Sequence, residues 1–335
     1  MNKTIFSVIK YVLIFAVGIA LLWLAFRGVR LKDTVHEMLQ ANLFWVLVSI
    51  AASLVAFVSR AIRWNMLIEP LGFKPTLGNT SAALMIGYLA NLAIPRIGEV
   101  TRCATLSRVE KVPFNSLLGT VIIERIIDVL CLLLCILFVA MTEYDRLINF
   151  LNQNIFNPLT RKFTSTINSP LVIITIASVL ILLFFLIFRK KEKTNKISGK
   201  ISSLLIGIVN GIDAVRKLKS PLAFIFHSVL IWVMYYLMSF TCFFALEATS
   251  SLNWHASLFV LVVGGMGMSA PVQGGIGAYH LLVSQGLMLY GLTQEHGLAF
   301  ATLLHTSQTL VVIILGGLAF LYLSLKRKNG TTQVT

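Results

Sequence analysis

Stretches without a single Asp, Glu, Lys or Arg recur along almost the whole chain, and they restrict its fold more than any other feature. They cover residues 11–26, 41–59, 75–95, 167–188, 221–246, 248–294 and 296–325. A helix needs about 20 mostly apolar residues to cross the hydrocarbon core of a membrane. Apolar residues make up 57% of the chain and charged residues only 12%, which leaves too little polar surface for a soluble enzyme. The sequence therefore predicts an all-α, polytopic integral membrane protein with about six full crossings.

Two of these stretches are interrupted by residues that break helices. Pro95 ends a stretch rich in Gly, Asn, Ser and Ala, and Pro271 precedes a glycine-rich turn at 274–277. Proline removes a backbone donor and glycine weakens a helix. Irregular backbone at membrane depth persists only where protein or a water-filled cavity surrounds it. We therefore predict two re-entrant hairpins, near residues 77–110 and 256–291.

The distribution of positive charge favours a re-entrant first hairpin. The basic segments are Lys3 to Lys10, Arg60 to Lys74, Arg96 to Lys111, Arg189 to Lys219 and Lys326 to Lys328. A re-entrant hairpin places all of them on one side of the membrane, whereas a full crossing by residues 75–95 divides them. The side richest in Lys and Arg is the cytoplasmic one. We therefore expect both termini to be cytoplasmic.

These elements predict two inverted repeats, each with three crossings and one hairpin. Residues 1–145 form the first repeat and residues 167–325 the second, with an extracytoplasmic loop at 146–166 and a cytoplasmic tail at 326–335. Because an odd number of crossings inverts the chain, the hairpins enter from opposite faces and meet near the middle of the membrane. Broken segments at matching positions of inverted repeats indicate the binding site of a transporter.

A basic segment at residues 189–219 follows the first crossing of the second repeat. Apolar residues between Ile201 and Val215 recur there at helical spacing, with polar residues off that face. A helix of this kind lies on the anionic surface of a membrane. We therefore expect an interfacial cytoplasmic helix, and the alternative is a docking site for a cytoplasmic partner.

The span 113–142 carries Glu124, Arg125 and Asp128 between apolar arms. Ionisable groups at such depth are costly, and they face the protein interior or water. One interpretation is a structural ion pair, with Arg63, Arg96 or Arg102 as the candidate partner. The other is a headgroup or proton site on a hydrated path. If a carboxylate lies on such a path, its replacement by the amide should lower transport while the amount of folded protein stays near normal. The relevant substitutions are Glu99→Gln and Glu124→Gln. We expect this for both, and we leave Asp128 open because it lies one turn deeper.

Several arginines lie at positions where a lipid phosphate would pass. Arg96 and Glu99 flank the first break, and Arg102 follows one turn later. A guanidinium group stays charged at depth and binds phosphate through two parallel hydrogen bonds. We favour a functional role for Arg96. For Arg102, and for Arg60 and Arg63 before the hairpin, the alternative is a side chain that extends to the cytoplasmic surface.

The second break carries glycines and is followed by a histidine. The glycines are Gly274, Gly275 and Gly277. They do not form a phosphate-binding loop, because no strand precedes them and no Lys-Ser or Lys-Thr follows them. Open backbone amides at the start of a half-helix still offer a site for an anionic oxygen. His280, and His305 on the last helix, either make interhelical hydrogen bonds or couple transport to protons.

The remaining residues give no positive support for catalysis or for a cofactor. The sequence has no DxD signature, no HExxH and no nucleophile elbow. The four cysteines form no CxxC pair, which argues against a zinc site and a disulfide framework. The 28 Lys and Arg exceed the 13 Asp and Glu, but they mostly lie between apolar stretches. We therefore expect anionic lipid as the partner, no nucleic acid, no metal and no enzyme activity.

Four motifs follow one another along the chain. They are Arg60-x-x-Arg63-Trp64, Asn91-x-x-x-Pro95-Arg96-x-Gly98-Glu99-x-x-Arg102, Glu124-Arg125-x-x-Asp128 and Pro271-x-x-Gly274-Gly275-x-Gly277. In this order they resemble the lysylphosphatidylglycerol synthetase transmembrane family, the flippase-like membrane module of the multiple peptide resistance factor. The resemblance covers nearly the whole chain. It implies a polytopic inner-membrane protein that moves lipids, or helps to move them, between leaflets.

Two features depart from the family pattern. The family module is often fused to a cytoplasmic aminoacyl-transferase domain, and the chain up to Thr335 has no room for one. We therefore expect no synthesis of lysyl lipid. A carboxylate is expected shortly after the Gly-Gly-x-Gly turn, but Tyr279 and His280 stand there. His280 is then the titratable group that substitutes for it.

The leading hypothesis is a lipid translocase of the bacterial cytoplasmic membrane, which moves an anionic, aminoacylated or polyprenyl-linked lipid between leaflets. The alternatives are an integral-membrane transferase or hydrolase that acts on a lipid phosphate, and an accessory subunit of a separate lipid-modifying enzyme. Proton coupling is assigned to Glu99, Glu124 and His280. The expected substrate-binding residues are Arg60, Arg63, Arg96, Glu99, Arg102, Glu124, Arg125, Asp128, Gly274, Gly275 and Gly277.

Overall fold

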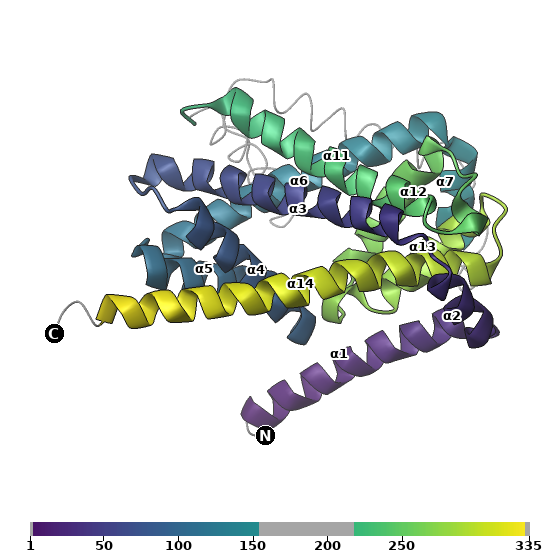
Figure 1. The fold of residues 1–335 in the computed structure, drawn as a ribbon, viewed down its shortest axis with the longest axis horizontal. Coiled ribbons are helices and arrows are strands. Elements are labelled where there is room, and N and C mark those ends of the chain that lie inside the picture. Colours follow the sequence, from purple (N-terminus) through teal and green to yellow (C-terminus); the bar gives the residue numbers. More distant parts are fainter. Residues whose placement is uncertain (1–2, 154–217, 332–335) are drawn as a thin grey trace, which may run out of the picture.

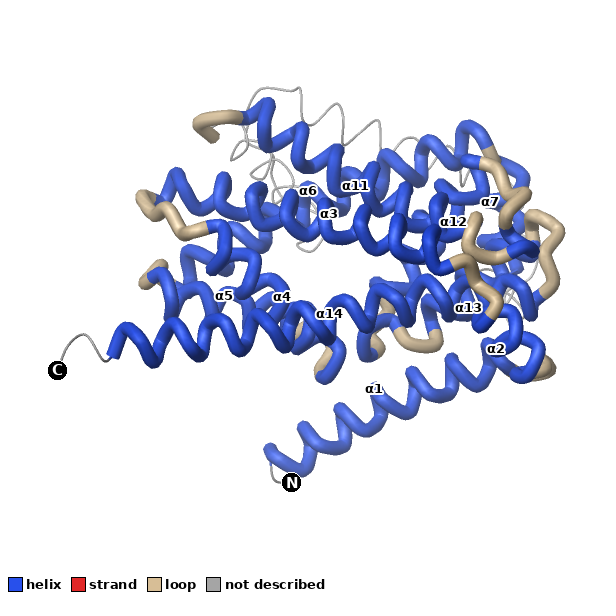
Figure 2. Tube along the Cα trace, viewed as in Figure 1, coloured by secondary structure: helices blue, strands red, loops and turns tan. Residues whose placement is uncertain are grey.

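The computed structural model describes residues 3–153 and 218–331, and every regular element within them is a helix (Figure 2). The all-α prediction is therefore confirmed for this part of the chain. The predicted crossing at 167–188 lies outside the described residues. So do most of the loop at 146–166, most of the basic segment at 189–219 and the end of the tail.

Five long helices form the body of the molecule (Figure 1). They are α1 (Lys3–Phe26), α3 (Leu43–Ile68), α6 (Phe114–Thr142), α11 (Pro221–Phe243) and α14 (Gln294–Thr331). Within residues 3–153 and 218–331, three stretches are long and apolar enough to cross a membrane, namely Leu43–Leu71, Pro221–Phe243 and Gln294–Lys326. The helix α6 is similar in length to these spans but is not among them, and it carries Glu124, Arg125 and Asp128. These helices agree with a polytopic membrane protein.

Large apolar side chains remain on the outside of these helices. Leu222 and Phe226 on α11 and Ile314 and Phe320 on α14 are all more than half exposed. An exterior of this kind is unstable in water, and it suits the hydrocarbon of a membrane. Buried apolar clusters lie behind it, and the largest joins α11, α12, α13 and α14 to the end of α6.

Each predicted hairpin consists of two packed helices joined at a break. The first is α4 (Leu77–Ala93) with α5 (Gly98–Glu110), and the second is α12 (Trp254–Ser269) with α13 (Ala278–Met288). In Figure 1 the first pair points inward from the end where α14 finishes, and the second points inward from the opposite end. The hairpins therefore approach the centre of the molecule from opposite ends.

The first hairpin closes tightly because two glycines face each other across it. A Cβ atom on Gly87 would lie 2.8 Å from the carbonyl oxygen of Gly98, and a Cβ on Gly98 would clash with the Gly87 carbonyl. The side-chain oxygen of Asn91 accepts a hydrogen bond from the Gly98 amide at 2.7 Å. Arg96 lies within this turn at a φ of +63°, an uncommon value for a residue with a side chain.

The described helices differ from the expected segments at two places, and one helix is additional. The helix α3 does not end at residue 59 but continues through Arg60 and Arg63 to Ile68, because these charges are buried and paired inside the protein. The helix α7 (Tyr144–Leu151) crosses the predicted boundary between the first repeat and the loop at 146–166. A short amphipathic helix, α2 (Leu31–Leu39), was not predicted.

Candidate functional site

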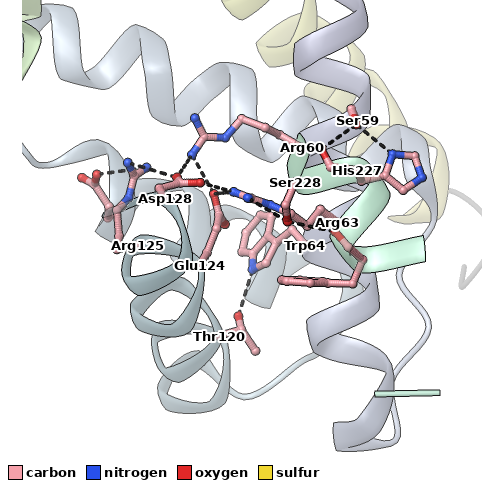
Figure 3. Close-up of polar contacts among 12 residues, drawn as sticks. Ser59, Arg60, Arg63, Trp64, Thr120, Glu124, Arg125, Asp128, His227 and Ser228 are labelled. Carbon is pink, nitrogen blue, oxygen red and sulfur yellow. Dashed lines mark hydrogen bonds and ion pairs between the residues drawn. The ribbon is translucent and has the colours of Figure 1, made fainter. Parts of the chain in front are cut away.

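An ionic cluster joins α3, α5 and α6. Figure 3 shows its members on α3 and α6. Arg60 donates from Nη2 to Glu124 Oε1 at 2.9 Å and to Asp128 Oδ2 at 2.6 Å. Arg63 donates from Nη2 to Asp128 Oδ1 at 2.6 Å. Arg102 donates from Nη1 to Glu124 Oε2 at 3.0 Å. Two carboxylates thus hold three guanidinium groups together.

Helical spacing places these residues on facing sides. Arg60 and Arg63 are three positions apart on α3, and Glu124 and Asp128 are four apart on α6, so each pair lies on one face of its helix. Arg102 comes from the second helix of the first hairpin. The cluster therefore connects that hairpin to two long helices.

The two carboxylates differ in exposure. The Glu124 side chain is fully enclosed, whereas the Asp128 side chain is 15% exposed. The sequence predicts the opposite order, with Glu124 on a hydrated path and Asp128 deeper. The difference arises because Arg63 Nη2 also approaches Glu124 at 3.5 Å, so that three guanidinium groups surround this one carboxylate.

A looser ion pair continues the cluster toward its exposed end. Arg125 Nη2 lies 3.5 Å from Glu99 Oε1, with exposed fractions of 44% and 28% for the two side chains. Arg125 Nη1 lies 3.9 Å from Asp128 Oδ2. Solvent thus reaches the cluster from the side of Arg125 and Glu99.

The cluster has more arginines than carboxylates, and some of its donors have no partner. Arg60, Arg63, Arg102 and Arg125 face three carboxylates. Buried nitrogens without a hydrogen bond are the Nε atoms of Arg60, Arg63 and Arg102 and the Nη2 atom of Arg102. Buried polar groups nearly always have partners. In the described residues these nitrogens, together with the acceptor Glu99 Oε2, are the buried cluster atoms without a partner in the protein.

Aromatic residues fix the arginines in position. The Arg102 guanidinium lies over the Trp64 ring, 4.7 Å from its centre, and Trp64 Nε1 donates to Thr120 Oγ1 at 2.9 Å. Arg60 Nη1 donates to the hydroxyl of Tyr235 on α11 at 2.8 Å. Sequence reasoning missed Tyr235, since a tyrosine in an apolar helix carries no local signal of its partner.

Arg96 stands apart from the ionic cluster. Its side chain is exposed, and its Nη2 atom lies 3.4 Å from the backbone oxygen of Ser269 at the end of α12. Of the three arginines proposed as ion-pair partners, Arg63 and Arg102 do contact Glu124. Arg96 contacts the second hairpin instead.

The two breaks touch each other. Besides the contact from Arg96 to Ser269, a Cβ atom on Gly274 would lie 2.9 Å from Leu92 Cδ2 of α4. Gly274 belongs to η4 (Gln273–Gly275), a turn that packs against α4. Gly274, Gly275 and Gly277 all have positive φ values, which glycine adopts without strain. These glycines therefore shape the turn where the hairpins meet.

Two histidines brace the second break. His305 Nε2 donates to the backbone oxygen of Gly274 at 2.8 Å, and the Gly277 amide donates to His280 Nδ1 at 3.4 Å. The two imidazole rings lie 4.9 Å apart. The contacts of His305 match the interpretation as an interhelical hydrogen bond. Proton coupling by His280 stays a prediction.

The described residues contain no group of three or more His, Cys, Asp or Glu side chains that could hold a metal ion. The four cysteines are free thiols that lie buried or half-buried. The ion pairs of the cluster consist of guanidinium and carboxylate groups, which bind anions and protons.

The helices, the two opposed hairpins and the buried ionic cluster define a polytopic membrane protein with broken segments at its centre. The chain matches the lysylphosphatidylglycerol synthase TM region over residues 8–316 and belongs to this family, which confirms the resemblance drawn from the motifs. It is also similar to the UPF0104 membrane protein MJ1595 of Methanocaldococcus jannaschii, with 26% identity over 141 residues. That match covers 41% of this chain and 40% of the relative. No solved structure matches the chain.

Proposed function

We propose that the protein is a lipid translocase that moves an anionic, aminoacylated or polyprenyl-linked lipid between leaflets. One observation carries the proposal: a buried cluster in which arginines outnumber carboxylates and keep unpaired nitrogen donors. A structural ion network gains most when every buried donor is paired. Donors left open in the middle of a membrane protein suit a charged cargo that arrives and leaves.

The chemistry of the cluster matches the main obstacle to lipid movement. A phosphate group does not cross hydrocarbon unaided, because the loss of its hydration is costly. Guanidinium groups that are already oriented replace that hydration with charge-assisted hydrogen bonds. The headgroup enters in this proposal from the side of Arg125 and Glu99, which is the exposed end of the cluster.

The first hairpin is the element that would move. It brings Glu99 and Arg102 to the cluster, while the other members lie on α3 and α6. An entering phosphate binds the free edge of Arg102, formed by Nε and Nη2, while Glu124 keeps its hydrogen bond to Nη1. Because the two hairpins touch through Arg96 and Ser269, a shift of the first reaches the glycine turn of the second. Proton uptake by Glu99 or His280 is the proposed source of direction. Glu124 does not fit this role, because three guanidinium groups enclose its carboxylate.

The charge distribution supports a location and an orientation. Family membership and the apolar helices establish a membrane location. We infer the bacterial cytoplasmic membrane, with both termini in the cytoplasm, from the basic segments of the chain. The proposed partners are membrane lipids and a separate lipid-modifying enzyme that makes or uses the cargo.

Reconstitution tests the proposal. Purified protein in vesicles should transfer fluorescent short-chain lipids between leaflets, measured by the fraction that an impermeant quencher reaches. Arg125→Gln removes one cation from the entrance to the cluster and should reduce the transfer rate about tenfold. This factor corresponds to about 1.4 kcal/mol in the activation free energy of transfer. Arg146→Gln is the matched control, because Arg146 is 43% exposed and pairs with Glu143 away from the cluster.

Three outcomes would replace the proposal. Absence of transfer for every headgroup would overturn it. Metal-dependent turnover of lipid-linked phosphates would favour the transferase or hydrolase. Transfer that appears only after addition of a lipid-modifying enzyme would favour the accessory subunit.

A further inference from the structure

We infer that the ionic cluster selects lipids whose headgroup is a phosphate diester with one net negative charge, over zwitterionic and doubly charged headgroups. The inference names the substrate class of the proposed site and rests on the proposed function. It narrows the cargo to one charge state, and it disfavours aminoacylated lipids whose amino groups cancel the phosphate charge.

The charge of the cluster is the first argument. Its ion pairs involve four arginines and three carboxylates, namely Arg60, Arg63, Arg102 and Arg125 with Glu99, Glu124 and Asp128. The excess is one positive charge. An uncompensated charge in a protein interior is costly. A headgroup with one negative charge cancels the excess, a zwitterion leaves it in place, and a doubly charged headgroup leaves a negative charge.

The geometry of Arg102 is the second argument. Its Nη1 atom is held by Glu124 at 3.0 Å and its plane lies over Trp64, so the guanidinium group is fixed. The remaining edge, formed by Nε and Nη2, has no partner although the residue is only 3% exposed. This edge presents two parallel N–H groups, the arrangement that binds two oxygens of one phosphate.

A nearby hydroxyl adds a donor. The Tyr88 hydroxyl on α4 is buried without a hydrogen-bond partner, and the Tyr88 ring packs against Phe57 on α3 at 5.4 Å. The guanidinium edge can only donate and the phenol is able to donate one hydrogen bond, which suits the non-bridging oxygens of a diester. A phosphate monoester offers the same oxygens but has a net charge of about −1.5 to −2 at pH 7. This charge is larger than the single positive charge that the cluster has in excess.

A competition experiment tests the selection. Full-length protein in neutral detergent is incubated at pH 8 with equal amounts of phosphatidylglycerol, phosphatidylethanolamine and phosphatidic acid, and the retained lipids are counted by native mass spectrometry. We expect phosphatidylglycerol to exceed each of the others about tenfold. Equal retention of the three would overturn the inference, and this comparison requires no variant.

Two variants shift the charge in opposite directions. Glu99→Gln raises the excess to two and should make phosphatidic acid the preferred lipid. Its control is Glu69→Gln, which removes a carboxylate of similar exposure (34%) that pairs with Lys219 outside the cluster. Arg125→Gln cancels the excess and should make phosphatidylethanolamine the preferred lipid, with Arg146→Gln as its control. Unchanged preferences in both cluster variants would overturn the inference.

Water-soluble probes separate the two sources of the same chemistry. Glycerophosphoglycerol and inorganic phosphate carry the phosphate without acyl chains, and we expect neither to displace phosphatidylglycerol at tenfold excess. Displacement by the free diester would overturn the assignment to a lipid. Selective retention without transfer in vesicles would support this inference and overturn the proposed function. Transfer without charge preference would support the proposed function and overturn this inference.

Discussion

At the scale of residues, Glu124 is the centre of the ionic cluster. Its two oxygens face guanidinium groups of Arg60, Arg63 and Arg102 at 2.9, 3.5 and 3.0 Å, and no part of its side chain is exposed. Asp128 shares two of these partners but reaches solvent. The two carboxylates therefore respond differently when their charge is removed.

Glu124→Gln should destabilise the protein strongly. The substitution leaves three buried guanidinium groups with one neighbouring carboxylate, a loss of about 3–5 kcal/mol in the free energy of unfolding. This reverses the expectation from the sequence, which treats Glu124 as hydrated. Asp128→Asn should cost less, because water compensates part of the lost charge. The measurement is the accumulated protein level together with thermal unfolding in detergent.

A second substitution provides the control for this prediction. Arg102→Gln in the Glu124→Gln background removes one stranded cation and should recover part of the stability, since contacting residues are not additive. A stable Glu124→Gln variant with reduced transport would contradict the prediction and return Glu124 to a hydrated path.

The residues of the ionic cluster could be predicted from the sequence, but the contacts between them could not. Glu124 and Asp128 are recognisable because charges are rare in an apolar helix. Arg60 and Arg63 remain ambiguous in the sequence, since arginines at the end of an uncharged stretch usually extend to the membrane surface. Their burial depends on α6 and α11, which are distant in the chain. Local spacing does not contain that information.

At the scale of elements, the breaks were predictable and the ends of helices were less so. The helices α4 and α12 end just before Pro95 and Pro271 as expected, and the glycines at 274–277 shape the turn that follows α12, because the backbone limits of proline and glycine act locally. Arg60 did not end α3, because a charge ends a membrane helix only where it must reach water. Tertiary pairing removed that need.

Gly98→Ala should open the first hairpin. A methyl group at this position would clash with the Gly87 carbonyl and with the Asn91 side chain, and overpacking of this kind costs about 1–3 kcal/mol. The control is Gly119→Ala on α6, where a Cβ meets nothing within 4 Å. That substitution should be neutral or slightly stabilising, by up to about 1 kcal/mol. Equal thermal stability of the two variants would show that the hairpin is not closed through these glycines.

Two substitutions of Arg96 distinguish the effect of its backbone conformation from the effect of its side chain. Glycine relieves the strain of its positive φ, whereas alanine keeps the strain. Arg96→Gly should therefore be about 1 kcal/mol more stable than Arg96→Ala, measured by thermal unfolding in detergent. Both variants lose the contact with Ser269, and both should lower lipid transfer to the same extent. A difference in transfer between them would assign the role of Arg96 to its backbone.

At the scale of the whole molecule, polar contacts join neighbouring elements at each of its two ends. At one end, Lys326 Nζ donates to Asn79 Oδ1 at 3.1 Å and Lys219 Nζ donates to Glu69 Oε1 at 2.8 Å. At the other, the Asn42 amide donates to the Ala245 carbonyl at 2.8 Å. The first hairpin thus starts beside the end of α14, while the membrane orientation inferred from the charge distribution stays a prediction. The prediction used Arg60 and Arg63 as surface charges, although the structure buries both.

Cysteine labelling should place both arms of the first hairpin on the cytoplasmic side. Single cysteines at Lys74, Arg108 and Gly330 should react with an impermeant thiol reagent from the cytoplasm, and one at Ser250, an exposed residue between α11 and α12, should react from outside. The four native cysteines, none of them exposed, are replaced by alanine. A re-entrant hairpin returns the chain to the side from which it entered, whereas a crossing does not. Labelling of Lys74 and Arg108 positions from opposite sides would mean that α4 and α5 cross the membrane. It would also remove the argument from charge for cytoplasmic termini, because the basic segments would then lie on both sides.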